Sequence, residues 1–282
     1  MKNIELLAAY FTIAGDIHPF GPTEISPFDF RYRAEAAAKA GYSGIGLVHA
    51  DLMHTVDQIG FSEMKTILEN NGIKHLEFEF LDNWFEQGEA RRASDKMRKE
   101  LLHAAEVLGA RDIKIAPALF KDEANIPLMV EEFAKVSQEA AQVGTSIVLE
   151  IMPFSNVRTI DTALGIVQGA NQPNGGLLLD IWHLSRGGIQ WSEIEKIPAQ
   201  FIGAVELDDA DLYPVNPLWQ DTIHKRKLPG EGVLDVQGFI KAIMAKGYSG
   251  PWGVEVLSEV VRKLPLEEMA KCTYDTTIAQ FS

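Results

Sequence analysis

Short apolar runs alternate with longer, more polar segments along the whole chain. Eight of these runs have the length and composition of buried strands, and they cover residues 4–12, 44–48, 75–81, 112–116, 146–150, 175–180, 202–206 and 252–255. Apolar runs bounded by glycines or turn residues are typical of strands that are buried on both faces, as in parallel sheets. The pattern therefore predicts a parallel sheet built from these runs.

The segments between the strands predict about eight helices, most of which end close to a glycine. Glycine adopts the left-handed conformation of a helix C-cap without steric cost, and proline fits the first turn of a helix. The expected helices cover residues 26–40, 61–71, 88–108, 122–143, 159–169, 191–197, 235–246 and 265–279, and a long loop is expected at 208–232. No Gly/Ser linker or low-complexity segment interrupts the alternation, so residues 1–282 are expected to form a single domain.

Eight β/α units in 282 residues are what a closed (β/α)8 barrel, the TIM barrel, requires. Right-handed crossovers would place the carboxyl ends of all strands on one face of this α/β fold. An open, doubly wound sheet is the alternative. It is disfavoured because the loop after the first strand has no GxGxxG motif, and because acids recur at the ends of the last four strands.

Each of the last four predicted strands ends in an acidic residue. These acids are Glu150, Asp180, Glu206 and Glu255. In a closed barrel their carboxylates would converge on one cavity, where mutual repulsion demands a neutralising partner. A divalent cation is the simplest partner, and ligation by oxygen alone favours Mn²⁺ or Mg²⁺ over Zn²⁺. The alternative is that individual acids lie on the surface or pair with a basic residue such as Lys114, Arg158 or Arg226.

Five further residues near strand ends are candidates for contacting a substrate. His183 follows the sixth strand and is expected to hydrogen-bond a substrate or to act as a general acid or base, although a lone histidine is often structural. His49 follows the second strand in the same way. Trp84, after the third strand, suits either the wall of a sugar-sized pocket or loop packing. Lys114 lies inside the fourth strand, where a charge is out of place unless it faces the cavity. Arg226 suits an anionic or hydroxyl-rich substrate.

The overall charge limits the classes of partner. With 26 basic and 40 acidic residues the net charge is −14, which argues against nucleic-acid binding because that needs a basic surface. No stretch approaches the ~18 apolar residues of a membrane span. The first ten residues lack a signal-peptide pattern because Glu5 interrupts their apolar run, and the single cysteine, Cys272, excludes an internal disulfide. We therefore expect a cytoplasmic protein with a small-molecule substrate, without nucleic-acid or membrane partners.

Several motifs resemble a known family. They are Glu150, Asp180-Ile-Trp-His183, Pro229-Gly-Glu-Gly232 and the stretch from Gly247 to Glu255, and they resemble the xylose isomerase-like TIM-barrel superfamily. Within it, the chain resembles the sugar phosphate isomerase/epimerase group, which includes ketose 3-epimerases, inosose dehydratases and 3-dehydroshikimate dehydratases. The resemblance spans nearly the whole chain, and its motifs are specific for the superfamily rather than for one substrate.

The resemblance implies a divalent metal held by Glu150, Asp180 and Glu255, with a fourth ligand at the end of the seventh strand. The family commonly has histidine or glutamine there, whereas this chain has Glu206, so either Glu206 or the neighbouring Asp208 is expected to complete the site. Mn²⁺ or Mg²⁺ is expected, with Zn²⁺ and Co²⁺ as alternatives. A homodimer or homotetramer is also expected from the resemblance.

The expected function is the metal-dependent isomerisation or epimerisation of a keto-sugar or related polyol through an enediolate. The resemblance implies that Glu150 and Glu255 act as base and acid as well as metal ligands. His183 and Arg226 are expected to hold substrate oxygens. Dehydration of an inosose or a 3-dehydroshikimate-like substrate begins with the same proton removal and stays open. A DNA-repair endonuclease of the endonuclease IV type is disfavoured by the acidic charge and by Glu206. A non-catalytic barrel that binds metal or sugar is a further alternative, against which the intact set of acids argues.

Overall fold

The computed structural model describes residues 4–282, in which eight strands pair in order from β1 to β8 and close into a parallel barrel. The strands are β1 (Leu6–Ala8), β2 (Gly44–Val48), β3 (His75–Leu81), β4 (Asp112–Ile115), β5 (Ser146–Glu150), β6 (Gly175–Asp180), β7 (Ile202–Leu207) and β8 (Trp252–Val254). The predicted (β/α)8 barrel is confirmed. Met1 to Asn3, which begin the segment judged not to be a signal peptide, lie outside the described residues.

Helices follow the strands throughout the described chain. The α-helices are α1 (Phe30–Ala40), α2 (His49–Asn70), α3 (Gly88–Leu108), α4 (Ile126–Gln142), α5 (Ile160–Ala170), α6 (Ile181–Arg186), α7 (Leu218–His224), α8 (Val236–Ala245) and α9 (Leu266–Ile278). Short 3₁₀ helices are η1 (Tyr10–Thr12), η2 (Trp191–Lys196), η3 (Ala199–Phe201), η4 (Val261–Lys263) and η5 (Ala279–Phe281). Within residues 4–282, none of the helices combines the length and the hydropathy that crossing a bilayer demands.

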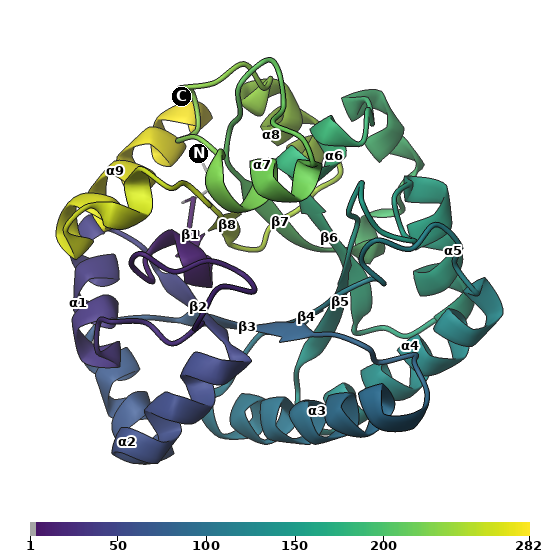
Figure 1. Cartoon of the computed structure of the whole chain (residues 1–282), viewed down its shortest axis with the longest axis horizontal. Coiled ribbons are helices and arrows are strands. Elements are labelled where there is room, and N and C mark those ends of the chain that lie inside the picture. Colours follow the sequence, from purple (N-terminus) through teal and green to yellow (C-terminus); the bar gives the residue numbers. More distant parts are fainter. Residues whose placement is uncertain (1–3) are drawn as a thin grey trace. The chain divides into compact units, whose positions relative to one another are not determined.

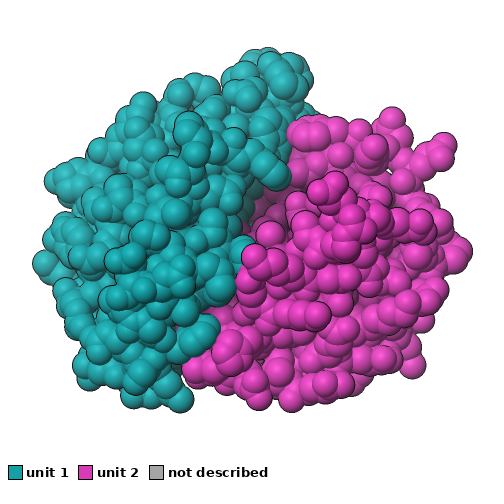
Figure 2. All heavy atoms as spheres, turned by 60° about the horizontal axis from the view of Figure 1, so that its bottom comes forward, with its two compact units in different colours: residues 1–77, 206–240, 251–282 teal, residues 78–205, 241–250 magenta. Residues whose placement is uncertain are grey.

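The chain divides into two compact units, which Figure 2 distinguishes by colour. Unit 1 comprises residues 1–77, 206–240 and 251–282, and unit 2 comprises residues 78–205 and 241–250. The boundary falls inside β3 and inside β7, so each unit holds part of these two strands. The expectation of a single domain stays a prediction.

In unit 1, β1 lies between β2 and β8, with Leu7 opposite both Gly44 and Gly253. The end of β7 continues this sheet, because Glu206 pairs with Gly253 of β8. Helices α1 and α9 lie side by side on the outside (Figure 1). They are joined through the α1–β2 turn, where the buried hydroxyl of Tyr42 donates a hydrogen bond to Thr273 of α9 over 2.9 Å.

In unit 2, β4, β5 and β6 form a parallel sheet that α4 and α5 cover from outside (Figure 1). Close packing here depends on a glycine at the start of β6. A Cβ added to Gly175 would lie 2.5 Å from the ring of Phe133, which is fully buried on α4. Because any side chain would overlap this ring, glycine is the residue that lets α4 approach the sheet.

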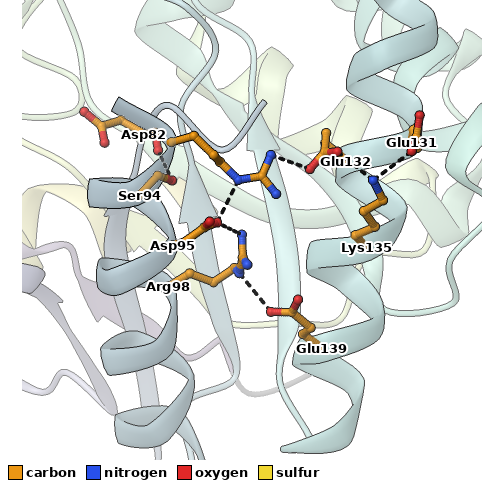
Figure 3. A network of polar contacts seen from close by, with 9 residues as sticks. Asp82, Ser94, Asp95, Arg98, Glu131, Glu132, Lys135 and Glu139 are labelled. Atoms are coloured by element: carbon orange, nitrogen blue, oxygen red, sulfur yellow. Dashed lines mark hydrogen bonds and ion pairs between the residues drawn. The ribbon is translucent and has the colours of Figure 1, made fainter. Parts of the chain in front are cut away.

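Charged residues connect α3 to α4 at the surface of unit 2 (Figure 3). Arg98 of α3 donates to Glu139 of α4 over 2.8 Å, and Arg91 reaches Glu132 over 2.6 Å. Asp95 lies between the two arginines and accepts from both. Each of these two pairs joins a buried side chain, Arg98 or Glu132, to a partner that is partly exposed. Their shared arrangement fixes the register of one helix against the other.

Two of the expected elements have different bounds, and specific side-chain hydrogen bonds decide both. The run at 4–12 is a short strand followed by η1, since the hydroxyl of Thr12 donates to the carbonyl of Val254 over 2.6 Å and accepts the N–H of Val256. The helix expected from residue 26 begins at Phe30, because the side chain of Asp29 caps it by accepting the N–H of Tyr32.

Three helical segments differ from the prediction more strongly. The helix expected at 61–71 is the second half of α2, which starts at His49 and is kinked at Gly60, where φ is 74°. The short helix α6, directly after β6, was not predicted. The loop expected at 208–232 contains α7, whose last turn carries His224.

Candidate active site

Three predicted site residues of unit 2 come together at the carboxyl ends of β5 and β6. Glu150 ends β5, Asp180 ends β6, and His183 lies in the first turn of α6. All three are buried, and each offers a ligand atom within 4.8 Å of the others. The Nε2 atom of His183 lies 3.3 Å from Oε1 of Glu150. This group has the composition and the proximity of a metal or acid–base site.

The short sequence Asp-Ile-Trp-His explains the position of the histidine. Asp180 is the last residue of β6 and the N-cap of α6, and its Oδ1 accepts the backbone N–H of His183 over 2.9 Å. This capping interaction starts a helix at the mouth of the strand and turns the third residue back toward the acid. The imidazole meets the ring of Trp182 edge-on, with centroids 5.0 Å apart, and that of Phe154 at 5.6 Å.

The acids of unit 1 are organised by one buried arginine. Arg226 is about 1% exposed, and its Nη1 lies 2.5 Å from Oδ2 of Asp208 and 3.0 Å from Oε2 of Glu255. Its Nη2 donates to the hydroxyl of Thr222. Arg226 therefore balances the charge of Asp208 and fixes the orientation of Glu255.

Glu206 stands next to this cluster in the same sheet. It belongs to the last part of β7, pairs in register with Gly253 and is about 1% exposed. Glu255 follows β8 directly, and its N–H donates to the carbonyl of Leu207. Unit 1 thus places two carboxylates at the carboxyl ends of neighbouring parallel strands.

The remaining predicted residues lie in different surroundings. Lys114 is buried in β4 and faces Glu79, with Nζ 3.6 Å from Oε2. Trp84 exposes no surface, and its indole N–H donates to the carbonyl of Ala116 over 2.7 Å. His49 begins α2 and is half-buried. Roles in substrate binding for Lys114, Trp84, His49 and Arg226 stay predictions.

A second cluster in unit 1 ties together the loops after β1, β7 and β8. Arg262 donates through Nη1 to Nδ1 of His224 over 2.9 Å, and through Nε to Asp16 over 2.8 Å. The ring of His18 packs edge-on against His224. Burial, the charge of Arg262 and His18 together lower the pKa of His224 below 6.5. The members of this cluster are far apart along the chain, so no sequence motif indicates it.

Residues 34–275 match the family described as the xylose isomerase-like TIM barrel, and the chain belongs to this family. Among curated relatives, it is 28% identical over 260 residues to an inosose isomerase of Halalkalibacterium halodurans, covering 86% of this chain and 88% of that protein. It is also 28% identical over 240 residues to a 3-dehydroshikimate dehydratase of Pseudomonas aeruginosa. That match covers 83% of this chain and 37% of the dehydratase.

Solved structures support the same fold. The crystal structure of the IolI protein with a bound zinc atom superimposes with a TM-score of 0.86 and 21% identity, over 98% of both chains. At this identity the likeness establishes the barrel architecture. The characterised relatives therefore include an isomerase and a dehydratase, and they define an enzyme superfamily rather than a single reaction.

Proposed function

We propose that this protein is a divalent-metal-dependent isomerase or epimerase that acts on a keto-sugar or related polyol through an enediolate. The observation that carries the proposal is the buried set of acids at the ends of β5 to β8, with His183 directly beside Glu150. Such a set suits removal and return of a proton next to a carbonyl.

The order of the strands supports a single metal site. β5 to β8 follow one another around a closed parallel barrel, so their carboxyl ends belong to the same end of it. We infer that Glu150, Asp180, Glu206 and Glu255 jointly hold one cation. Buried carboxylates need such compensation, and their oxygens suit a hard ion such as Mn²⁺ or Mg²⁺. A histidine donor beside them also suits Zn²⁺, the metal bound by IolI.

We assign the fourth ligand to Glu206 rather than to Asp208. Asp208 is fully buried and forms the shorter of the two ion pairs of Arg226, at 2.5 Å against 3.0 Å for Glu255. Moving it to a metal would leave the guanidinium with less compensation in a buried position. Glu206 therefore supplies the carboxylate where relatives commonly have histidine or glutamine.

In the proposed reaction, Glu150, Asp180, Glu206 and Glu255 would hold the cation, which would supply Lewis-acid stabilisation of negative charge on the substrate carbonyl oxygen. Glu150 removes the proton from the adjacent carbon, and Nε2 of His183, 3.3 Å from Oε1 of Glu150, shares that proton. We assign the return of a proton to Glu255, whose Oε2 lies 3.0 Å from Nη1 of Arg226. Return to the same carbon gives an epimer, and return to the former carbonyl carbon gives an isomer.

Dehydration is the second candidate, and the 28% identity to a 3-dehydroshikimate dehydratase favours keeping it. It begins with the same removal of a proton next to a carbonyl. The outcome then depends on whether a β-hydroxyl leaves before the proton returns. The two reactions share Glu150 as base and differ in their products.

Proton NMR in D₂O distinguishes these outcomes. Protein loaded with Mn²⁺ is incubated with ketoses, inososes and 3-dehydroshikimate, and Mn²⁺ is removed with a chelating resin before spectra are recorded. Deuterium next to the carbonyl together with a new sugar or inosose supports the isomerase or epimerase. A new olefinic or aromatic signal identifies a dehydratase. Absence of exchange with every compound, despite bound metal, contradicts the proposal.

A further inference from the structure

An exposed phenylalanine lies close to the predicted catalytic residues of unit 2. Phe120, in the loop between β4 and α4, is 66% exposed and has a φ of 58°. Left-handed backbone is unusual for a bulky side chain and persists where the surrounding structure enforces it. An exposed aromatic ring also carries an unfavourable hydration cost. Both features call for an explanation.

The loop after β5 holds Phe120 in place. The N–H of Phe120 donates to the carbonyl of Phe154 over 2.7 Å, and Leu119 pairs with Ser155 in an antiparallel bridge. Asn156 completes the pairing, because its side-chain oxygen accepts the N–H of Ala118 over 2.8 Å. The two loops form one small two-stranded ribbon, so these contacts fix the backbone from which the Phe120 ring extends.

The aromatic side chains continue from this ribbon to the catalytic acid. The ring of Phe120 stacks on that of Phe154, with centroids 5.9 Å apart and an interplanar angle of 24°. Phe154 meets His183 edge-on at 5.6 Å, and His183 contacts Glu150. A series of side-chain contacts therefore links the exposed ring of Phe120, through Phe154 and His183, to the group proposed to remove the proton.

We propose that Phe120 and Phe154 form a wall against which the C–H face of a ring-shaped keto-polyol packs, and that Phe120 is a specificity-determining residue. A ring presents its axial C–H groups as a flat apolar face, which suits stacked aromatic rings. An open-chain ketose would first have to lose the freedom of its rotatable bonds. This inference rests on the proposed function and deepens it, since it names the shape of the substrate.

Kinetics with Phe120→Ala tests the wall. We expect the KM for a ring ketone, an inosose or 3-dehydroshikimate, to rise about tenfold while kcat changes less than twofold, and about tenfold corresponds to about 1.4 kcal/mol. Phe120→Tyr keeps the ring and should retain the wild-type KM. Met244→Ala, which removes an apolar side chain that is 43% exposed elsewhere in unit 2, is the matched control. An unchanged KM in Phe120→Ala overturns the inference.

A binding measurement separates this inference from the proposed function. Protein labelled with 4-fluorophenylalanine gives a ¹⁹F signal for residue 120, assigned by its absence in Phe120→Tyr. A shift of that signal on adding the ring ketones, with Mg²⁺ present but without turnover, supports the wall and contradicts the proposed reaction. Turnover without a shift keeps the reaction and overturns the wall. If neither a shift nor turnover is observed, both the wall and the proposed reaction are contradicted. If the protein is a dimer that dissociates only in Phe120→Ala, the ring contacts a second copy of the chain, and the wall is overturned.

Discussion

Replacing Arg226 with methionine should destabilise the protein more than replacing an exposed charged residue does. Methionine keeps most of the length of the side chain but removes the guanidinium, which is about 1% exposed beside the fully buried carboxylate of Asp208. The same change deprives Glu255 of its 3.0 Å contact. Two buried acids are then left without compensation by Arg226.

Breaking a buried ion pair by removing one partner typically costs about 3–5 kcal/mol, because the other charge stays desolvated. We expect Arg226→Met to lower the free energy of unfolding by an amount in that range. Arg158→Met is the matched control, since its partner Asp122 is 91% exposed. Exposed pairs contribute about 0–1 kcal/mol, so the control should change little.

The assay is urea denaturation followed by circular dichroism, in EDTA so that metal binding does not contribute. A double-mutant cycle with Asp208→Asn isolates the pair. The double variant should be at least about 1 kcal/mol more stable than the sum of the single changes predicts, because no buried carboxylate remains at position 208. Two results would refute the stabilising role of Arg226. One is that the two single changes add within about 0.5 kcal/mol, and the other is that Arg226→Met lowers the free energy of unfolding no more than Arg158→Met does.

Three further predictions concern pH, packing and metal. The lowered pKa of His224 means that the unfolded chain takes up a proton near pH 6.5 before the folded chain does, so stability should fall as the pH drops through 6.5 toward the lower folded value. As the pH drops, the urea concentration at the midpoint of unfolding should fall less in His224→Gln than in the wild type. An equal fall in both proteins would contradict the role given to His224. Gly175→Ala should cost about 1–3 kcal/mol, because its Cβ would meet the Phe133 ring at 2.5 Å. Gly165→Ala, whose nearest contact is 3.9 Å, is the control; similar unfolding free energies in both variants would refute the packing argument. Chelation should lower Tm and Mn²⁺ should restore it, since a ligand of the folded state stabilises that state; an unchanged Tm would argue against a bound metal.

The barrel was predictable because the strands of a buried parallel sheet appear in the sequence as apolar runs. Strands β5 and β6 end at the predicted residues, Glu150 and Asp180. Element boundaries set by distant partners were not predictable: Thr12 shortens the first strand by bonding to Val254, which is 242 residues away in the chain.

The positions of the acids at the strand ends were predictable from the sequence, whereas the contacts around them were less so. Residue type and position at strand ends singled out Glu150 and His183. The pairing of Asp208 with Arg226 needed the structure, because the sequence offered both Glu206 and Asp208 as ligands. The Phe120–Phe154 stack was missed for the same reason, since two loops bring those rings together.

The central claim is that Glu150 removes a proton next to a substrate carbonyl. The most direct test is deuterium exchange in D₂O, measured by NMR on the best substrate for wild type, Glu150→Gln and Glu131→Gln, with bound metal quantified in each. Glu131 is an exposed acid on α4 that pairs with Lys135, and it serves as the control (Figure 3). We expect exchange in wild type and Glu131→Gln and none in Glu150→Gln. Full exchange by Glu150→Gln with metal still bound would contradict the mechanism.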